Sequence, residues 1–194
     1  MLILVRHGRT YANAQSLLQG HMDPPLDEVG VDQAHRTARV LNELYPNATV
    51  LSSPLQRARV TAQTVSPEIV IEERFIELNY GEFDGVPMAD IPADVWNTWR
   101  NDHHFRPPKG ETLAELDVRV HEALNDLSQR AMKEDVIVVS HVSPIKSAVV
   151  WALRGDTSMT WRCSLDRASI TRIAISPRGP SLVGFNDTAH LDVK

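Results

Sequence analysis

Short apolar runs of strand length recur along this chain, and longer stretches with the spacing of an amphipathic helix lie between them. The strand-like runs are residues 2–5, 48–51, 69–71 and 136–139, followed by alternating stretches near 168–175 and 181–185. Helical patterns occupy residues 27–44 and 113–132. Strands that alternate with helices predict an α/β fold, a three-layer α/β/α sandwich with a mostly parallel central sheet.

Residues typical of helix N-caps predict where the helices begin. Thr112 followed by Glu115 has the pattern of a capping box at the start of the 113–132 stretch. In LSSPLQRARVTA, residues 51–62, we expect Ser53 to cap a helix that begins at Pro54, with Gln56 completing a second box. The same Ser-Pro start recurs in VIVVSHVSPIK, where Ser143 and Pro144 follow His141.

Length and composition indicate one domain spanning residues 1–194. The chain carries a formal net charge of -5 and no basic run interleaved with aromatic residues, so we expect no nucleic-acid partner. Cys163 is the single cysteine, which rules out an intramolecular disulfide and a four-cysteine zinc site. The apolar runs at 2–5 and 148–153 are too short for a signal peptide core or a membrane span. We therefore expect a soluble, cytoplasmic protein with no membrane partner.

Charged and imidazole side chains follow three of the predicted strands. The first strand ends in Arg6-His7-Gly8, the second leads to Arg57 in the opening turn of a helix, and the fourth ends in His141. Ligands of such sheets bind beyond the carboxyl ends of the strands. Two arginines, two histidines and the nearby helix N-termini suit a tetrahedral dianion such as phosphate, and a glycine allows close approach of the backbone.

These motifs resemble the histidine phosphatase superfamily, in its phosphoglycerate-mutase-like branch. The resemblance covers nearly the whole chain and rests on these segments: RHGRTYAN at 6–13, QG at 19–20, PLDEVGVDQA at 25–34, SSPLQRARVTA at 52–62, ELNYGEFDG at 77–85, KGET at 109–112 and VSH at 139–141. Relatives usually carry glycine after the second histidine, whereas Val142 stands here. The α-ribazole-phosphatase-like members and small acid phosphatases are the most similar types.

The resemblance implies a role for each matching residue. His7 would be the nucleophile that becomes phosphohistidine, and Glu77 would be the proton donor. Arg6, Arg57 and His141 would hold the phosphoryl oxygens. The residues expected to assist in binding are Gly8, Asn13, Gln19, Ser53, Glu111 and, through its backbone N–H, Val142. Lys146 stands one helical turn further on and either touches an acidic group of the substrate or is solvated.

The expected chemistry is hydrolysis of a small phosphorylated metabolite without a metal or cofactor. Arginines supply the charge neutralisation that phosphoryl transfer needs, and a histidine nucleophile divides the displacement into two steps. The remaining histidines lack the spacing of metal ligands. We expect activity weighted toward acidic or neutral pH, because Glu77 must carry a proton.

Two other functions stay open. A mutase would return the phosphoryl group to the substrate, but the residues 86–110, which we expect to form a small capping segment, make a modest lid for that purpose. A protein that binds phosphorylated ligands without turnover would normally lack the nucleophile or an arginine. Many relatives form homodimers, although no apolar stripe identifies an interface in this chain.

Overall fold

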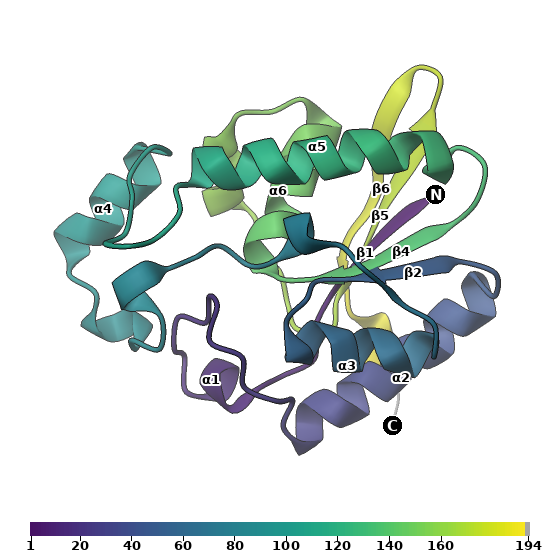
Figure 1. Ribbon diagram of the computed structural model, residues 1–194, viewed down its shortest axis with the longest axis horizontal. Coiled ribbons are helices and arrows are strands. Elements are labelled where there is room, and N and C mark those ends of the chain that lie inside the picture. Colours follow the sequence, from purple (N-terminus) through teal and green to yellow (C-terminus); the bar gives the residue numbers. More distant parts are fainter. Residues whose placement is uncertain (193–194) are drawn as a thin grey trace.

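The computed structural model describes residues 1–192 and contains one six-stranded sheet (Figure 1). The strand order is β3-β2-β4-β1-β5-β6. The strands are β1 (Leu2–Arg6), β2 (Thr49–Ser52), β3 (Val70–Ile71), β4 (Val136–Ser140), β5 (Ile170–Ser176) and β6 (Gly179–Asp187). The first four are parallel to one another, and β5 and β6 add an antiparallel edge. The predicted, mostly parallel sheet is confirmed.

Alternation along β1 divides the core into two halves, one on each face of the sheet. Leu2 and Leu4 belong to the apolar cluster shared with α5 (Leu113–Ala131) and α6 (Val142–Leu153). Ile3 and Val5 belong to the cluster shared with α2 (Glu28–Leu44) and α3 (Gln56–Val65). Because successive side chains of a strand point to opposite faces, a continuous apolar run supplies both clusters. Helices therefore cover both faces, as the three-layer prediction requires (Figure 1).

The parallel strands β1, β2 and β4 end at the same edge of the sheet, and the shorter elements gather there. They are α1 (Tyr11–Ala14), α4 (Ala93–Asn101) and the 3₁₀ turns η1 (Glu73–Phe75), η2 (Gly81–Phe83), η3 (Met88–Asp90), η4 (Thr157–Arg162) and η5 (Ala189–Leu191). Figure 1 shows α4 at the end of the molecule opposite the N-terminus. Trp99 of α4 is 1% exposed and extends the α5/α6 core outward.

Two predicted helix starts are wrong, and long-range contacts explain both. Helix α3 begins at Gln56 rather than at Pro54, and its first N–H donates to Asp23 from a distant loop at 2.7 Å. The hydroxyl of Ser53 accepts from the N–H of Leu55, before the helix, at 3.3 Å and hydrogen-bonds to His141 at 2.7 Å. The capping box at Thr112 is confirmed, because both of its partners lie within one turn.

Helix α6 begins at Val142, with His141 rather than Ser143 as the residue before its first turn. Pro144 is tolerated there because the first N–H groups of a helix have no acceptor within the helix. The earlier start leaves the N–H groups of Val142 and Ser143 directed at the sheet edge, where they bind a carboxylate described below.

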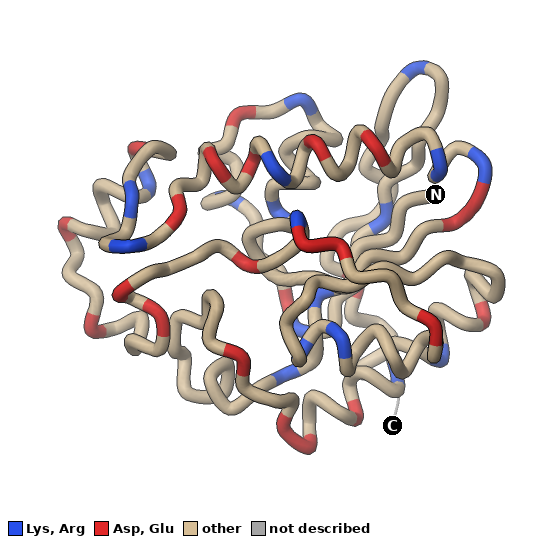
Figure 2. Tube along the Cα trace, in the orientation of Figure 1, with Lys and Arg blue, Asp and Glu red and all other residues tan. Residues whose placement is uncertain are grey.

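Within residues 1–192, no helix is both long and apolar enough to cross a membrane. Acidic and basic positions are mixed along the chain without a long run of one sign, as Figure 2 shows.

Candidate active site

A polar chamber of about 180 Å³ lies beyond the carboxyl ends of β1 and β4. Its walls combine cationic, amide and apolar side chains with one carboxylate: Arg6, His7, Asn13, Ser16, Leu17, Leu18, Gln19, Glu77, Tyr80, Met88, Val142 and Arg167. The chamber therefore brings together side chains from the first strand, the loop that follows it and the start of α6. This is the edge at which the sequence predicted ligand binding.

His7 is 3% exposed and is held by its own backbone. Its Nδ1 lies 2.7 Å from the carbonyl oxygen of Gly8, which can only accept a hydrogen bond, so Nδ1 carries the proton. The other ring nitrogen, Nε2, is therefore the one with a free lone pair. Burial, followed by the charges of Arg57 and Arg6, lowers the pKa of His7 well below its usual value. The imidazole is thus neutral at physiological pH.

His141 lies beside His7, with 5.1 Å between the ring centroids, and is fully buried. Arg57 Nε donates to its Nδ1 at 3.2 Å, so Nε2 carries the proton and donates to Ser53 Oγ at 2.7 Å. Burial and the neighbouring Arg57 lower the pKa of His141 well below its usual value. Both ring nitrogens of His141 are therefore occupied by protein partners.

Arg57 is fully buried behind the wall of the chamber rather than lining it. Besides His141, its guanidinium donates to the carbonyl oxygens of Met22 at 2.7 Å and of Gly20 at 2.8 Å. Burial lowers its pKa to about 10, which leaves the group charged. Arg57 therefore fixes the His141 ring and the residue 20–22 loop, and it contributes positive charge beneath His7.

Arg6 and Arg167 meet in the chamber, and the sequence motifs pointed only to Arg6. Arg6 Nη1 donates to Leu165 O at 2.5 Å and Arg167 Nη2 donates to Asn13 O at 3.2 Å. Within residues 1–192, the buried Nε atoms of both guanidiniums have no hydrogen-bond partner. Burial and the like charge of Arg167 lower the pKa of Arg6 to about 10. Two half-buried cations that line one chamber form a cradle for an anion.

Glu77 is the one carboxylate among the described lining residues, and it is 4% exposed. Its oxygens accept hydrogen bonds from the N–H groups of Leu78 at 2.8 Å and of Val142 and Ser143 at 3.2 Å. The last two belong to the first turn of α6, whose N-terminus favours negative charge. Val142 therefore directs its backbone N–H at Glu77, not at the centre of the chamber.

Three further predicted residues shape the loop after β1. Asn13 and Gln19 line the chamber. Oriented so that its carbonyl oxygen faces the guanidinium, Gln19 accepts from Arg57 Nε at 2.9 Å. Gly8 does not line the chamber: its N–H donates to Thr61 at 3.2 Å, and a Cβ there would lie 2.3 Å from the carbonyl oxygen of Gly30. Glycine is needed at position 8 because the loop presses against α2.

Ser53 and Glu111 also lie outside the chamber walls. Ser53 accepts the hydrogen bond from His141 and so fixes its ring. Glu111 pairs with Arg119 at 2.7 Å, and Arg119 in turn donates to the carbonyl oxygens of Ile76 at 2.8 Å and Glu77 at 3.3 Å. Neither residue lines the chamber: Ser53 holds the ring of His141, and Glu111 holds Arg119, which binds the backbone at Glu77.

The sequence profile of the histidine phosphatase superfamily (branch 1) matches residues 2–188. The chain belongs to this superfamily. It is 31% identical to phosphoserine phosphatase 1 of Hydrogenobacter thermophilus, over 98% of this chain and 93% of that protein. It is also 31% identical to a protein named probable phosphoglycerate mutase in Yersinia pestis, over 98% of this chain and 94% of the relative.

A solved structure extends the likeness to three dimensions. Phosphoserine phosphatase from Entamoeba histolytica, as a mutant in complex with phosphoserine, superposes with a TM-score of 0.90 at 27% identity, covering 98% of both chains. The chain spans about half, 54%, of the length of mycobacterial relatives with which it is 32% identical. The superfamily assignment and the three-layer fold are therefore established for this chain.

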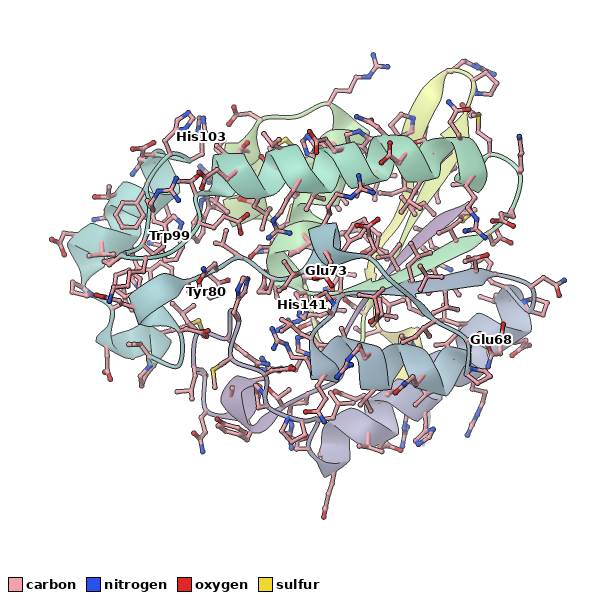
Figure 3. All side chains as sticks on the ribbon, viewed as in Figure 1. Glu68, Glu73, Tyr80, Trp99, His103 and His141 are labelled. Carbon is pink, nitrogen blue, oxygen red and sulfur yellow. The ribbon has the colours of Figure 1, made fainter. Side chains whose placement is uncertain are left out.

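Beside the polar chamber, this superfamily member has a second, apolar chamber of about 160 Å³. The two share four wall residues, namely Leu18, Tyr80, Met88 and Val142. The other walls of the apolar chamber are Leu78, Trp96, Trp99, Leu113, Ser143, Lys146, Thr160 and Trp161. Figure 3 shows His141, Tyr80 and Trp99 following one another from the centre of the molecule toward α4.

Tyr80 stands between the chambers, and neither it nor the apolar chamber was singled out by the sequence. Its hydroxyl lies 3.3 Å from Ser143 Oγ, and its ring meets Trp99 edge-on at 5.7 Å. Burial raises the pKa of Tyr80, so the phenol stays protonated. Tyr80 lies within the recognised ELNYGEFDG segment, which is the signal that could have identified it.

Within residues 1–192, no group of three or more His, Cys, Asp or Glu side chains is arranged so that it could bind a metal ion. The chamber's own charge comes instead from the guanidiniums already described. These residues fit a phosphate group directly.

Proposed function

We propose that this protein hydrolyses phosphomonoesters of small metabolites through a phosphohistidine on His7, with no metal ion. The observation that carries the proposal is the pair of half-buried guanidiniums, Arg6 and Arg167, that line the chamber beside a neutral imidazole. The two cations repel one another, and a phosphate dianion bound by both relieves this repulsion. The likeness to phosphoserine phosphatases supports the same activity.

In the first step, His7 Nε2 attacks phosphorus while the bond to the leaving oxygen breaks. The proton stays on Nδ1, which donates it in a hydrogen bond to Gly8 O, and this keeps the attacking Nε2 free. Arg6 and Arg167 stabilise the charge on the phosphoryl oxygens. Glu77, the carboxylate of the chamber, delivers the proton that the leaving alkoxide takes up.

In the second step, a water oxygen attacks phosphorus and the P–N bond breaks. Glu77, ionised after the first step, accepts the proton that the water loses. Inorganic phosphate leaves, and His7 and Glu77 return to their starting protonation states. Arg57, His141 and Ser53 act as positioning residues, because their hydrogen bonds fix the floor on which His7 lies.

The test is the release of phosphate from p-nitrophenyl phosphate in the presence of EDTA. We expect turnover with the chelator, a phosphohistidine on the His7 peptide in quenched samples, and a loss of roughly 10³-fold or more in His7→Ala. His35→Ala, at an exposed position of α2, is the matched control and should keep full activity. Phosphate binding without turnover would contradict the proposal and favour a binding protein.

A mutase is the second candidate, because one of the relatives carries that name. It would use the same His7 chemistry but return the phosphoryl group to a second hydroxyl before water attacks. Incubation with 2- and 3-phosphoglycerate separates the two: a mutase interconverts the isomers, and a phosphatase releases free phosphate. We expect phosphate release to dominate.

Three proposals concern the protein as a whole. Residues 1–194 form one domain in which residues 86–110 cap the chambers, supported by Met88, Trp96 and Trp99 in the chamber walls. Cytoplasmic location and a homodimer remain predictions from composition and resemblance. Light scattering of the purified protein measures its mass in solution, and a mass twice that of the 21.7 kDa chain would establish the dimer.

A further inference from the structure

The apolar chamber adjoins the polar one, and it offers space to a group attached to a phosphate there. The shared wall of Leu18, Tyr80, Met88 and Val142 leaves the two spaces adjacent. A phosphate held by Arg6 and Arg167 with its ester oxygen toward this shared wall would place the leaving group in the tryptophan-lined space.

The size of the apolar chamber sets the size of the group. It measures about 160 Å³. An apolar protein cavity of about 150 Å³ holds one benzene molecule, so the chamber fits a single ring. Trp96 and Trp99 stack at 5.6 Å, and Trp161 meets both edge-on at 6.2 Å. Such aromatic walls favour a planar guest that can stack or meet their edges.

One cation in the wall of the apolar chamber has no direct partner, although the more distant charge of Glu77 acts on it. Lys146 is half-buried on α6, and within residues 1–192 its ammonium has neither a hydrogen-bond nor an ion-pair partner. Burial lowers the pKa of Lys146, which shows the cost of keeping this charge away from water. Lys146 lies four residues after Val142 on the same helix, or about 6 Å along its axis. Its backbone therefore lies about one helical turn from Val142, which both chambers share.

We propose that the natural substrate is a phosphomonoester whose leaving group is one planar, apolar ring bearing an anionic substituent, with the ring in the apolar chamber and the anion on Lys146. This inference rests on the proposed function and names its substrate class. The phosphate occupies the polar chamber. The ring lies in the apolar chamber and places its anionic substituent next to Lys146. A carboxylate is the simplest such substituent, since it pairs with an ammonium at low desolvation cost when half-exposed.

The experiment compares three esters: ethyl phosphate, benzyl phosphate and 4-carboxybenzyl phosphate. Their leaving alcohols are similarly acidic, so differences in kcat/KM report binding of the leaving group rather than its chemistry. We expect benzyl phosphate to exceed ethyl phosphate at least tenfold, and the carboxylate to add a further factor of roughly 10 to 100, the range of a charge-assisted hydrogen bond.

Variants of the wall residues test which side chain causes each difference in kcat/KM. In Lys146→Met, which keeps the length of the side chain, the ratio of carboxybenzyl to benzyl phosphate should fall to about one or below. Lys133→Met, at an exposed position after α5, is the control that keeps the ratio. Trp161→Ala should lower the ratio of benzyl to ethyl phosphate, whereas Trp151→Ala, which lines a different cavity, should not.

Each outcome separates the two proposals. If Lys146→Met slows benzyl and carboxybenzyl phosphate equally, Lys146 has only a structural role and the inference is wrong. Faster hydrolysis of O-phosphoserine than of either benzyl ester would also overturn it, while leaving the phosphatase proposal intact. Failure to release phosphate from all four esters, with no phosphohistidine formed, would overturn the proposed function itself.

Discussion

The polar and apolar chambers share a wall, have nearly equal volumes and are built in different ways. The polar chamber takes its charged groups from strand ends and helix starts, where Arg6, His7 and Glu77 are fixed by backbone hydrogen bonds. The apolar chamber takes its walls from side chains of α4, η4 and α6, which pack ring against ring. Backbone positions thus fix the charged and imidazole groups, and side-chain packing shapes the adjoining apolar space.

This difference teaches why the same fold can serve several phosphate esters. Groups held by the sheet edge cannot move without disturbing the core, because β1 and β4 are almost completely buried. The walls of the apolar chamber come from the segment 86–110, from η4 and from one face of α6. Substitutions there change the shape of the space and leave the sheet intact.

The largest effect is expected from Arg57, which supports the polar chamber without lining it. Arg57→Ala should lower kcat/KM for every ester by roughly 10³-fold, because a preorganised charge and the His141 ring are lost together. Arg57→Lys keeps the charge but not the fork that reaches His141, Gly20 and Met22, so it should recover only part of the activity. Steady-state kinetics on benzyl and ethyl phosphate would measure both.

The control for Arg57 is Arg39→Lys, at an exposed position of α2. It should leave kcat/KM unchanged. An Arg57→Lys enzyme with full activity would show that the positive charge alone suffices. Precise positioning of the polar chamber by the hydrogen bonds of Arg57 would then not be needed for activity.

Glu77 should show its role through the leaving group. Glu77→Gln removes the transferable proton, so we expect kcat for ethyl phosphate to fall by roughly 10²-fold or more. The p-nitrophenolate ion leaves readily without a proton, so the loss on p-nitrophenyl phosphate should be much smaller. Glu82→Gln is the matched control, since Glu82 pairs with Lys109 at 2.9 Å on the surface. Equal losses on both esters would remove Glu77 from the proton-transfer step.

The smallest effect concerns stability and pH. His7 and His141 are buried with their pKa values lowered, so the unfolded chain binds protons below about pH 6.5 that the folded chain does not. Stability is therefore complete above this pH and is lost as pH falls, by up to about 1.4 kcal/mol per pH unit for each histidine. Urea unfolding at pH 7.5 and 5.5, in buffer without phosphate, measures the change.

In His7→Asn the stability should depend less steeply on pH, because one buried imidazole is removed. His35→Asn changes an exposed histidine and should keep the steeper dependence. If both variants lose stability as the unsubstituted protein does, the buried imidazoles are not the cause.

The sequence predicted the sheet, the helices and the meeting of Arg6, His7, Arg57 and His141, because each follows from a local pattern. It failed where the partner lies far along the chain. Ser53 has the right type for a helix cap, but its hydroxyl binds His141, and Asp23 binds the first N–H of α3 instead.

Arg167 was missed for a related reason. It stands in the loop before β5, outside every recognised motif, and becomes significant only because the fold places it against Arg6. The alternatives for Lys146 could not be separated either, since half-burial without a partner is a property of the surrounding chamber. Sequence patterns identify elements and motifs. Which unpaired groups lie next to one another can be seen only in the folded chain.

The alternation along β1 has a consequence for how this chain tolerates insertions. Ile3 and Val5 face α2 and α3, and Leu2 and Leu4 face α5 and α6, immediately before Arg6 and His7. One extra residue inside this strand would exchange the two sets of faces and turn the imidazole to the opposite side of the sheet. The direction in which the His7 side chain points therefore depends on the number of residues in the strand. Substitutions leave this number unchanged, whereas insertion of a single residue changes it.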